Sequence, residues 1–331
     1  MMAFNTEAML AAGQGVTITI SSGDNGAPDA DDKDHCLCSS NAGYNPNFPA
    51  SSPWVTTVGG TMGPEIGQAE IAAQSQLGGM ITSGGGFSNV FARPSWQSHA
   101  IPDYFNTLTA VNNLPHVGYN TSGRGYPDIS LISVKYQVII GGKQVSIFGT
   151  SASSPVLAAF VSLVNSYRMV QGKGPIGFLN PTLYSVGYNQ TQKIATKNDA
   201  TFIDMTSGHN KCCAYSGINP STNAQCCTSG FFTTNGWDPV TGWGSVLFTS
   251  FAAMFDVDIT YNPSSSSSSS LPDWEIGAIV GGVVGGMAIP GILLAFYFIG
   301  GFNKKFTTLP PPVVGESEHV EKINEIYFDC I

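Results

Sequence analysis

Charged residues are scarce in this chain. Of its 331 residues, 13 are Lys or Arg and 22 are Asp or Glu, so 11% are charged and the net charge is -9. No basic run offsets this acidity, which argues against a protein that binds nucleic acid by neutralising phosphates. Hydrophobic residues make up 42% of the chain, enough for a real core, which excludes a disordered protein. Sparse charge in a background rich in Gly, Ser and Thr is typical of secreted or luminal proteins.

The first residues lack what a secretory signal peptide needs, a basic segment followed by a continuous apolar one. Residues 3–12 instead favour the second half of a helix, and Gly13 and Gly15 supply stop signals. Residues 16–21 (VTITIS) then alternate like a strand. Because this is an internal αβ unit, we expect the chain to begin inside a domain.

The composition changes sharply near the carboxyl end. We divide the chain into a catalytic-type domain (1–262), a Ser-rich linker (263–274), a membrane span (275–303) and a tail (304–331). Residues 276–303 carry no charged side chain and exceed the roughly 20 residues that a helix needs to cross a bilayer. The alternative, a buried core helix, would need a further domain, which the short Pro-rich tail does not provide.

The charges around this span predict its orientation. Lys304 and Lys305 follow it and Asp273 precedes it, so the positive-inside tendency predicts a single-pass type I protein with a cytosolic carboxyl terminus. Glycines in the span include small-xxx-small pairs, which would allow a weak dimer: Gly277, Gly281, Gly282, Gly285 and Gly286. The sequons at Asn120 and Asn189 fit a luminal domain that carries glycans.

Cysteine placement agrees with that topology. An even set of six cysteines lies before the span, in three close clusters, and only Cys330 lies after it; the six are Cys36, Cys38, Cys212, Cys213, Cys226 and Cys227. An oxidising lumen would pair the six, and adjacent cysteines rarely bridge each other, so we expect disulfides that join different clusters. The alternative is a zinc site that uses thiolates with His35 or His209.

A Gly-Thr-Ser turn opens an apolar helix of small residues after residue 148. It places Ser151 at a helix N-terminus, with Pro155 expected in the first turn, where a missing N–H costs little. A hydroxyl held there can act as a nucleophile. Taken alone, the pattern is more often an ordinary N-cap serine.

Neighbouring motifs favour the nucleophile. The segment FGTSAS (148–153) resembles the SGTSAS motif of the sedolisin family, serine-carboxyl peptidases with a subtilisin-like fold, although Phe148 departs from it. Asp24 lies in SGD, where subtilisins proper have an asparagine, and Ala152 replaces the methionine of their GTSMA. The resemblance extends from about Glu7 to Phe255 and is closest to the tripeptidyl-peptidase-like branch.

The resemblance implies an α/β fold, with a subtilisin-like parallel sheet flanked by helices, incomplete at its N-terminus and followed by the single transmembrane helix. It also implies that Ser151 is the nucleophile and that a protonated Asp24 donates to the oxyanion, which predicts activity at acidic pH. The family's base is a glutamate oriented by an aspartate four residues on, and that pair would lie upstream of this chain. Glu7 is not accepted as the base because Ala11 stands where the aspartate should be.

Histidine offers no substitute for that base. A subtilisin-like mechanism at neutral pH needs a His base, but the five histidines of this chain lie in no matching motif: His35, His99, His116, His209 and His319. We therefore expect the chain as given to be inactive, and to be the carboxyl-terminal part of an acid peptidase.

The family also binds one calcium ion near its carboxyl end, and two segments here resemble that site: FIDMTSG (202–208) and TNGWDPVTGWG (234–244). Calcium prefers six or more hard oxygens. By resemblance, Asp204 and Asp238 would bind through side chains, and Met205, Thr234 and Gly236 through carbonyls. Thr234 departs from the family's glycine. The alternative is a pair of aspartates that cap turns.

Two further segments are less specific. Ser83, Gly84 and Gly85 match the family's cleft-lining loop, where glycine would let a substrate backbone approach closely, but a tight structural turn explains them equally well. Asp128 is expected to be a buried, hydrogen-bonded structural carboxylate.

The resulting hypothesis is a membrane-anchored serine-type peptidase. It would act on peptides or unfolded proteins, as a tripeptidyl-peptidase or an endopeptidase, in a lysosome, another acidic vesicle or outside the cell. The alternative is a non-catalytic binding or adhesion ectodomain that keeps the fold without the base. Retention of Ser151 and Asp24 favours the enzyme.

Overall fold

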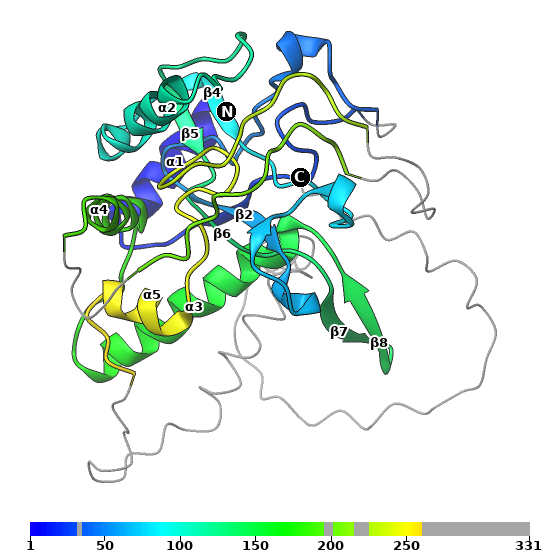
Figure 1. The fold of residues 1–331 in the computed structure, drawn as a ribbon. Helices are drawn as coiled ribbons and strands as arrows, with labels where there is room; N and C mark the ends of the chain where they lie inside the picture. The colour runs from blue at the N-terminus through cyan, green and yellow to red at the C-terminus, as the bar shows by residue number, and fades with distance from the viewer. Residues whose placement is uncertain (32–34, 195–200, 215–224, 260–331) are drawn as a thin grey trace, which may run out of the picture. The chain divides into compact units, whose positions relative to one another are not determined.

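A computed structural model describes residues 1–31, 35–194, 201–214 and 225–259, and all of them lie in one compact unit (Figure 1). The predicted linker, span, tail and dimer glycines lie outside these residues. No helix within the described ranges is both long and apolar enough to cross a bilayer.

The centre of the domain is a parallel sheet. Strand β1 (Thr19–Ser21) and strand β6 (Ile129–Ile132) both pair in parallel with β2 (Thr56–Met62). Because Val58 pairs with a residue of each neighbour, β2 lies between them. The predicted parallel sheet is therefore confirmed, although the strand expected at residues 16–21 is shorter, since ordered pairing with β2 begins only at Thr19. Strand β3 (Ile71–Ala72) adds a short antiparallel pairing at the carboxyl end of β2.

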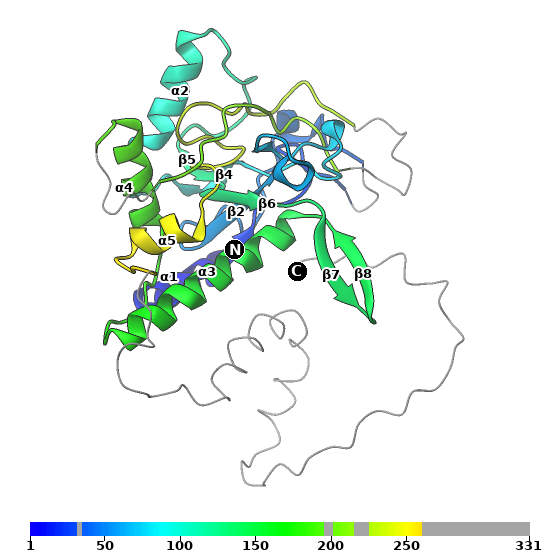
Figure 2. The ribbon, with the colours of Figure 1, turned by 60° about the horizontal axis from the view of Figure 1, so that its bottom comes forward.

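Helix α3 (Thr150–Val170) packs across β1, β2 and β6. Its buried apolar side chains, Leu157, Val161 and Val164, recur at the spacing of one helix face. Figure 2 shows α3 running beneath β2 and β6, with α2 on the opposite side. The position expected for Pro155 is wrong: the helix begins at Thr150, so Pro155 lies in the second turn, where it cannot donate to the carbonyl of Ser151.

The remaining elements surround this core. Helix α1 (Met2–Gly13) confirms the helix expected before Gly13. The other elements are α2 (Ala100–Ala110), α4 (Asn180–Thr191), α5 (Phe248–Met254), the antiparallel pairs β4 (Gly86–Ala92) with β5 (Gly123–Tyr126) and β7 (Tyr136–Ile140) with β8 (Lys143–Ile147), and the 3-10 turns η1 (Ser40–Gly43), η2 (Pro64–Ile66), η3 (Ser75–Leu77) and η4 (Ser95–Gln97).

Three disulfides join the cysteine clusters, as predicted: Cys36–Cys213, Cys38–Cys227 and Cys212–Cys226. No adjacent pair is bridged. These bonds consume the thiolates that the alternative zinc site would need. Two of them, Cys36–Cys213 and Cys38–Cys227, connect the segment after Asp24 to cysteines that lie 177 and 189 residues further along the chain.

A buried ion pair supports the start of β6. The Arg124 guanidinium donates to an Asp128 carboxylate oxygen at 2.6 Å, and both side chains are fully enclosed. Asp128 also accepts from the Thr57 N–H at 2.7 Å and the Tyr184 hydroxyl at 3.0 Å. Asp128 is therefore the buried structural carboxylate that the sequence predicted.

Candidate active site

The candidate site lies at the carboxyl ends of the parallel strands, where ligands of open α/β sheets commonly bind. Asp24 follows β1 after a tight turn, and the start of α3 returns to the end of β6 through a 2.7 Å hydrogen bond from the Gly149 N–H to the Ser133 carbonyl. Asp24 and the start of α3 meet although 126 residues separate Asp24 from Thr150. This juxtaposition places Asp24 beside the residue that precedes Ser151.

Thr150 holds the Asp24 carboxyl group. Its N–H and its hydroxyl donate to Oδ1 of Asp24 at 2.7 Å and 2.9 Å, and its Oγ1 also accepts from the Gly23 N–H at 3.1 Å. A Cβ atom on Gly149 would lie 2.9 Å from Oδ2 of Asp24, and Gly149 has a φ of +129°. A side chain there would therefore be strained and would crowd the carboxyl group.

The electrostatics of Asp24 favour its neutral form. Burial raises the pKa of Asp24, and the two hydrogen bonds from Thr150 oppose that rise. Because Oδ1 accepts both of those bonds, Oδ2 is the oxygen that remains to carry a proton. A protonated Oδ2 could donate a hydrogen bond to a developing oxyanion. Ser151 is half-buried at the second position of α3.

The raised pKa gives a stability prediction. An aspartate whose pKa is higher in the folded chain than in the unfolded chain stabilises the fold most below the unfolded pKa, and that stabilisation is lost as pH rises through the folded pKa. Asp24→Asn does not titrate, so its free energy of unfolding should increase relative to the parent between acidic and neutral pH. Urea unfolding of both chains across that range measures the difference.

Thr150→Val is the matched variant for this experiment. It removes the hydroxyl that donates to Asp24, so the pKa of Asp24 should rise further and the pH dependence should steepen. A difference between Asp24→Asn and the parent that stays constant with pH would contradict the assigned environment of Asp24.

The predicted cleft loop is held by the protein's own backbone. The buried Ser83 hydroxyl accepts from the Gly60 N–H at 3.0 Å and donates to the Val240 carbonyl at 2.8 Å. A Cβ atom on Gly84 would collide with the Ser22 carbonyl, and one on Gly85 with the carbonyl of Pro239. The structural alternative thus accounts for these residues, and their role as a substrate cleft stays a prediction.

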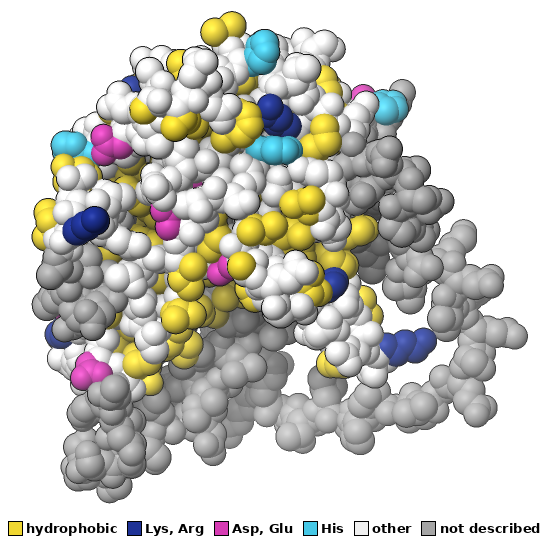
Figure 3. Space-filling model, in the orientation of Figure 1, with side chains coloured by type: hydrophobic (Ala, Val, Ile, Leu, Met, Phe, Trp, Pro, Cys, Tyr) yellow, Lys and Arg dark blue, Asp and Glu magenta, His cyan; other side chains and the backbone are white. Residues whose placement is uncertain are grey.

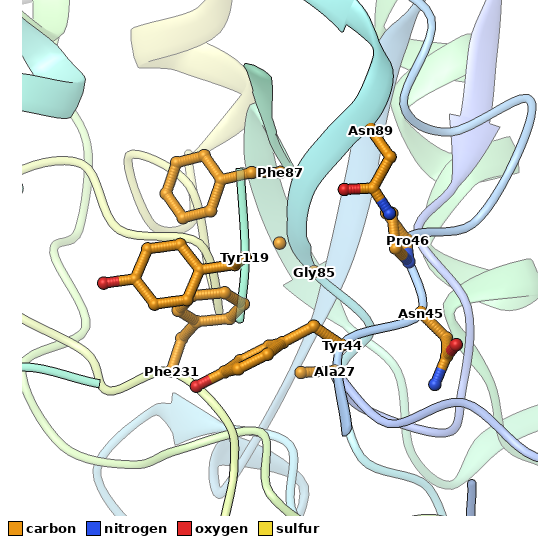
Figure 4. Close-up of a pocket in the computed structure, with 10 residues that line it drawn as sticks. Ala27, Tyr44, Asn45, Pro46, Gly85, Phe87, Asn89, Tyr119 and Phe231 are labelled. Carbon is orange, nitrogen blue, oxygen red and sulfur yellow. The ribbon is translucent and has the colours of Figure 1, made fainter. Parts of the chain in front are cut away.

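An aromatic hollow borders that loop. It is small, with a volume of about 10 Å³, and it is partly open to solvent. Figure 4 shows the rings of Phe87, Tyr119 and Phe231 facing it from one side and Pro46 from the other. Gly85 and Ala27 also line it, so the hollow adjoins both the loop and the segment that follows Asp24. It offers an apolar wall beside the candidate site.

The two predicted calcium-binding segments come together. Oδ2 of Asp204 accepts from the Gly236 N–H at 2.7 Å, and the negative charge of Asp204 is close enough to Asp238 to raise the pKa of Asp238. Asp238 is fully enclosed and accepts from the N–H groups of Thr234 and Thr241 at 3.1 and 2.8 Å. The turn-capping alternative is thus also visible in the geometry.

Unpartnered oxygens distinguish a cation site from simple capping. Oδ1 of Asp204 and Oγ1 of Thr234 are buried and have no hydrogen-bond partner within the described residues. Burial raises the pKa of Asp204 to about 6, and burial with the neighbouring Asp204 charge raises the pKa of Asp238 well above its usual range. Hard oxygens without donors, next to two destabilised carboxylates, fit a calcium ion. The residues present therefore suit that group.

The remaining sequence candidates lie elsewhere. Glu7 is exposed on α1, and His35, His99 and His116 are exposed as well. His209 is half-buried, and burial lowers its pKa. His319 lies outside the described residues. The general base therefore remains unassigned.

Sequence reasoning missed Thr150. Its position in Gly-Thr-Ser was visible, but its two bonds to Asp24 depend on a contact across 126 residues. In the first of the two sequons, Nδ2 of Asn120 donates to the Ser88 carbonyl at 2.9 Å. Glycosylation at Asn120 and Asn189 stays a prediction.

Comparisons with known proteins bear on this arrangement. No protein-family model matches the chain. Tripeptidyl-peptidase 1 of Bos taurus is 41% identical over 249 residues, and that of Homo sapiens is 39% identical over 249 residues. Each match covers 74% of this chain, which spans 38% of the length of these relatives. The solved structure of Pseudomonas sedolisin, a serine-carboxyl proteinase complexed with two molecules of pseudo-iodotyrostatin, matches with a TM-score of 0.51 and 26% identity, over 76% of this chain and 59% of that one.

A carboxyl group held at the N-terminus of a serine-bearing helix, on a parallel α/β sheet, is found here in a domain with a sedolisin-like α/β fold. The chain belongs to the sedolisin family, and within it is similar to tripeptidyl-peptidase 1.

Proposed function

We propose that the protein is a serine peptidase that works at acidic pH, with Ser151 as nucleophile and Asp24 as the donor to the oxyanion. The observation that carries this proposal is the 2.7 Å hydrogen bond from the Thr150 N–H to Asp24. Because Thr150 directly precedes Ser151, this bond holds the Asp24 carboxyl group beside the start of the helix that bears Ser151. The relatives named tripeptidyl-peptidase 1 support peptide substrates. Whether three residues are released at a time or the chain is cut internally is left to experiment.

The chemistry follows from the two side chains. The Ser151 hydroxyl attacks the scissile carbonyl while its proton passes to a general base, which by resemblance to the family is a glutamate that this chain does not contain, and negative charge develops on the carbonyl oxygen. A protonated Oδ2 of Asp24 donates to that oxygen, which a carboxylate anion could not do. Oδ1 is already occupied by the Thr150 N–H and hydroxyl, which keeps the acidic oxygen fixed in orientation.

The test measures hydrolysis of an unfolded polypeptide as a function of pH. The protein assayed is the form that its own cells produce. Activity should be highest in acid and fall as pH rises through the raised pKa of Asp24. Product masses distinguish tripeptide release from internal cleavage. An optimum near neutral pH would contradict the role of Asp24.

We also propose one structural calcium ion, held by Asp204 and Asp238 side chains and by the carbonyls of Met205, Thr234 and Gly236. When bound, the ion supplies positive charge that offsets the two buried carboxylates. Its support is the pair of unpartnered buried oxygens, on Asp204 and Thr234.

Chelation tests this ion. At calcium about 100-fold above its dissociation constant, a resident ion contributes about 2.7 kcal/mol, so excess EGTA should lower the melting temperature by roughly 5–10 °C. Magnesium added back should restore little and calcium should restore all of it. Asp204→Asn should melt lower and respond weakly to EGTA. An unchanged melting temperature in EGTA would refute the ion.

We further propose that residues 275–303 anchor the protein as a type I span, with the domain on the luminal or extracellular side of an acidic compartment or the cell surface. The support is the uncharged run at 276–303 followed by Lys304 and Lys305. The three disulfides agree with an oxidising compartment.

A further inference from the structure

The β7–β8 hairpin is a two-stranded ribbon with different faces. Its register places Tyr136 opposite Ile147, Val138 opposite Val145 and Ile140 opposite Lys143, so one face is apolar up to the lysine beside the turn. The other face carries Gln137, whose amide nitrogen Nε2 donates to the hydroxyl of its cross-strand partner Ser146 at 2.8 Å, and, closer to the turn, Ile139 opposite Gln144. The ribbon is therefore amphipathic.

Apolar side chains on both faces are exposed near the tip of the hairpin. Val145 is 40% exposed, Ile140 is 51% exposed and Ile139 is 70% exposed. Within the described part of the chain, β7 and β8 pair only with each other, and Figures 1 and 2 both show the ribbon extending away from the sheet. Exposed β-branched side chains on a projecting tip are unfavourable in water, which indicates a partner.

The charge of this segment has the opposite sign to that of the chain. Residues 133–150 include Lys135 and Lys143 and no Asp or Glu, whereas the whole chain carries -9. In Figure 3, basic and hydrophobic side chains, without acidic ones, occupy the region where Figure 1 places the ribbon. At its base, Tyr136 lies near Glu70, whose carboxylate accepts from the Thr61 and Ser245 hydroxyls. Apolar side chains flanked by lysines are the combination that binds a membrane interface.

The proposed anchor at residues 275–303 would keep the domain near such an interface. The last described residue is Ile259, and the uncharged run begins at residue 276. The residues between them can extend to at most roughly 55 Å. A domain on so short a tether meets the bilayer surface at high effective concentration, so weak contacts suffice.

We propose that the β7–β8 hairpin docks on the lipid bilayer by its apolar face and tip, with Lys135 and Lys143 at the headgroups. This inference rests on the proposed anchor. Because the hairpin leads directly into Gly149, Thr150 and Ser151, docking would hold the candidate active site close to the membrane and set its orientation there.

The test reconstitutes the full chain in liposomes that contain doxyl-labelled lipid. Ile140→Trp reports the hairpin, and Val117→Trp, which replaces an 86% exposed aliphatic residue, is the matched control. Each is compared with the parent chain, which has its own tryptophans. The fluorescence that Ile140→Trp adds to the parent signal should be quenched about twofold or more relative to the fluorescence that Val117→Trp adds. Lys135→Glu with Lys143→Glu should reduce the quenching, most strongly with phosphatidylglycerol present.

Each outcome decides the proposal. Equal quenching at positions 140 and 117 in a chain that floats with liposomes after an alkaline carbonate wash would overturn docking while leaving the anchor intact. A chain that does not float would overturn the anchor and the docking with it. A shift in the emission of Ile140→Trp that follows protein concentration without lipid would assign the hairpin to a second copy of the chain instead.

Discussion

Ser151→Ala, made in the protein in the form that its own cells produce rather than in the chain as given, should abolish peptide hydrolysis, with a loss in kcat on the order of 10⁴ to 10⁶-fold. The methyl group cannot form the covalent bond to the scissile carbonyl, and the neighbouring Asp24 cannot replace a nucleophile because its proposed role requires a proton. The fold should be preserved, since the substitution leaves the Thr150 N–H and hydroxyl that donate to Asp24 in place. The assay is polypeptide hydrolysis at acidic pH, with circular dichroism to confirm folding.

Ser166→Ala is the matched control for this loss. Ser166 lies on the same helix and its hydroxyl donates to the Ser162 carbonyl one turn away at 3.0 Å, so its replacement should leave activity within about twofold. Activity that survives Ser151→Ala would show that another residue is the nucleophile and would favour a binding role for this site.

Short motifs predicted where Asp24 and Ser151 lie in the fold, because both residues stand at element ends. Asp24 follows a strand and Ser151 begins a helix, and both turns carry residues that punctuate structure locally. The disulfide pattern was also predictable in outline, because adjacent cysteines rarely bridge each other. Pro155 was misplaced by one turn because the sequence does not mark which residue of Gly-Thr-Ser starts the helix.

Contacts between distant segments could not be predicted in the same way. Thr150 was not foreseen as the group that orients Asp24, because that bond joins residues 126 positions apart. The aromatic hollow combines residues from near positions 44, 87, 119 and 231, and nothing local in the sequence marks that meeting. Arg124 was missed for a different reason: arginine is rarely fully buried, so composition alone places it at the surface.

Arg124→Met should lower the free energy of unfolding by about 3–5 kcal/mol at neutral pH, because it leaves the Asp128 carboxylate buried without its cation. Arg124 is fully enclosed, donates to Asp128 at 2.6 Å and lies 5.7 Å from the centroid of the Trp96 ring. Methionine keeps much of the apolar volume, so the loss reports mainly the charge. Urea unfolding with the disulfides intact measures it.

The pH dependence separates this charge effect from a packing defect. Burial raises the pKa of Asp128 and the Arg124 guanidinium lowers it, so in Arg124→Met the pKa of Asp128 should rise further. Protonation then removes the uncompensated charge, and the loss of stability should shrink as pH falls through that raised pKa. Arg93→Met is the control: its guanidinium donates to the Thr121 carbonyl at the surface, and its cost should stay within about 0.5 kcal/mol. A loss of the same size at acidic and neutral pH would show that Arg124 acts through packing, and that Asp128 is held neutral even with the guanidinium present.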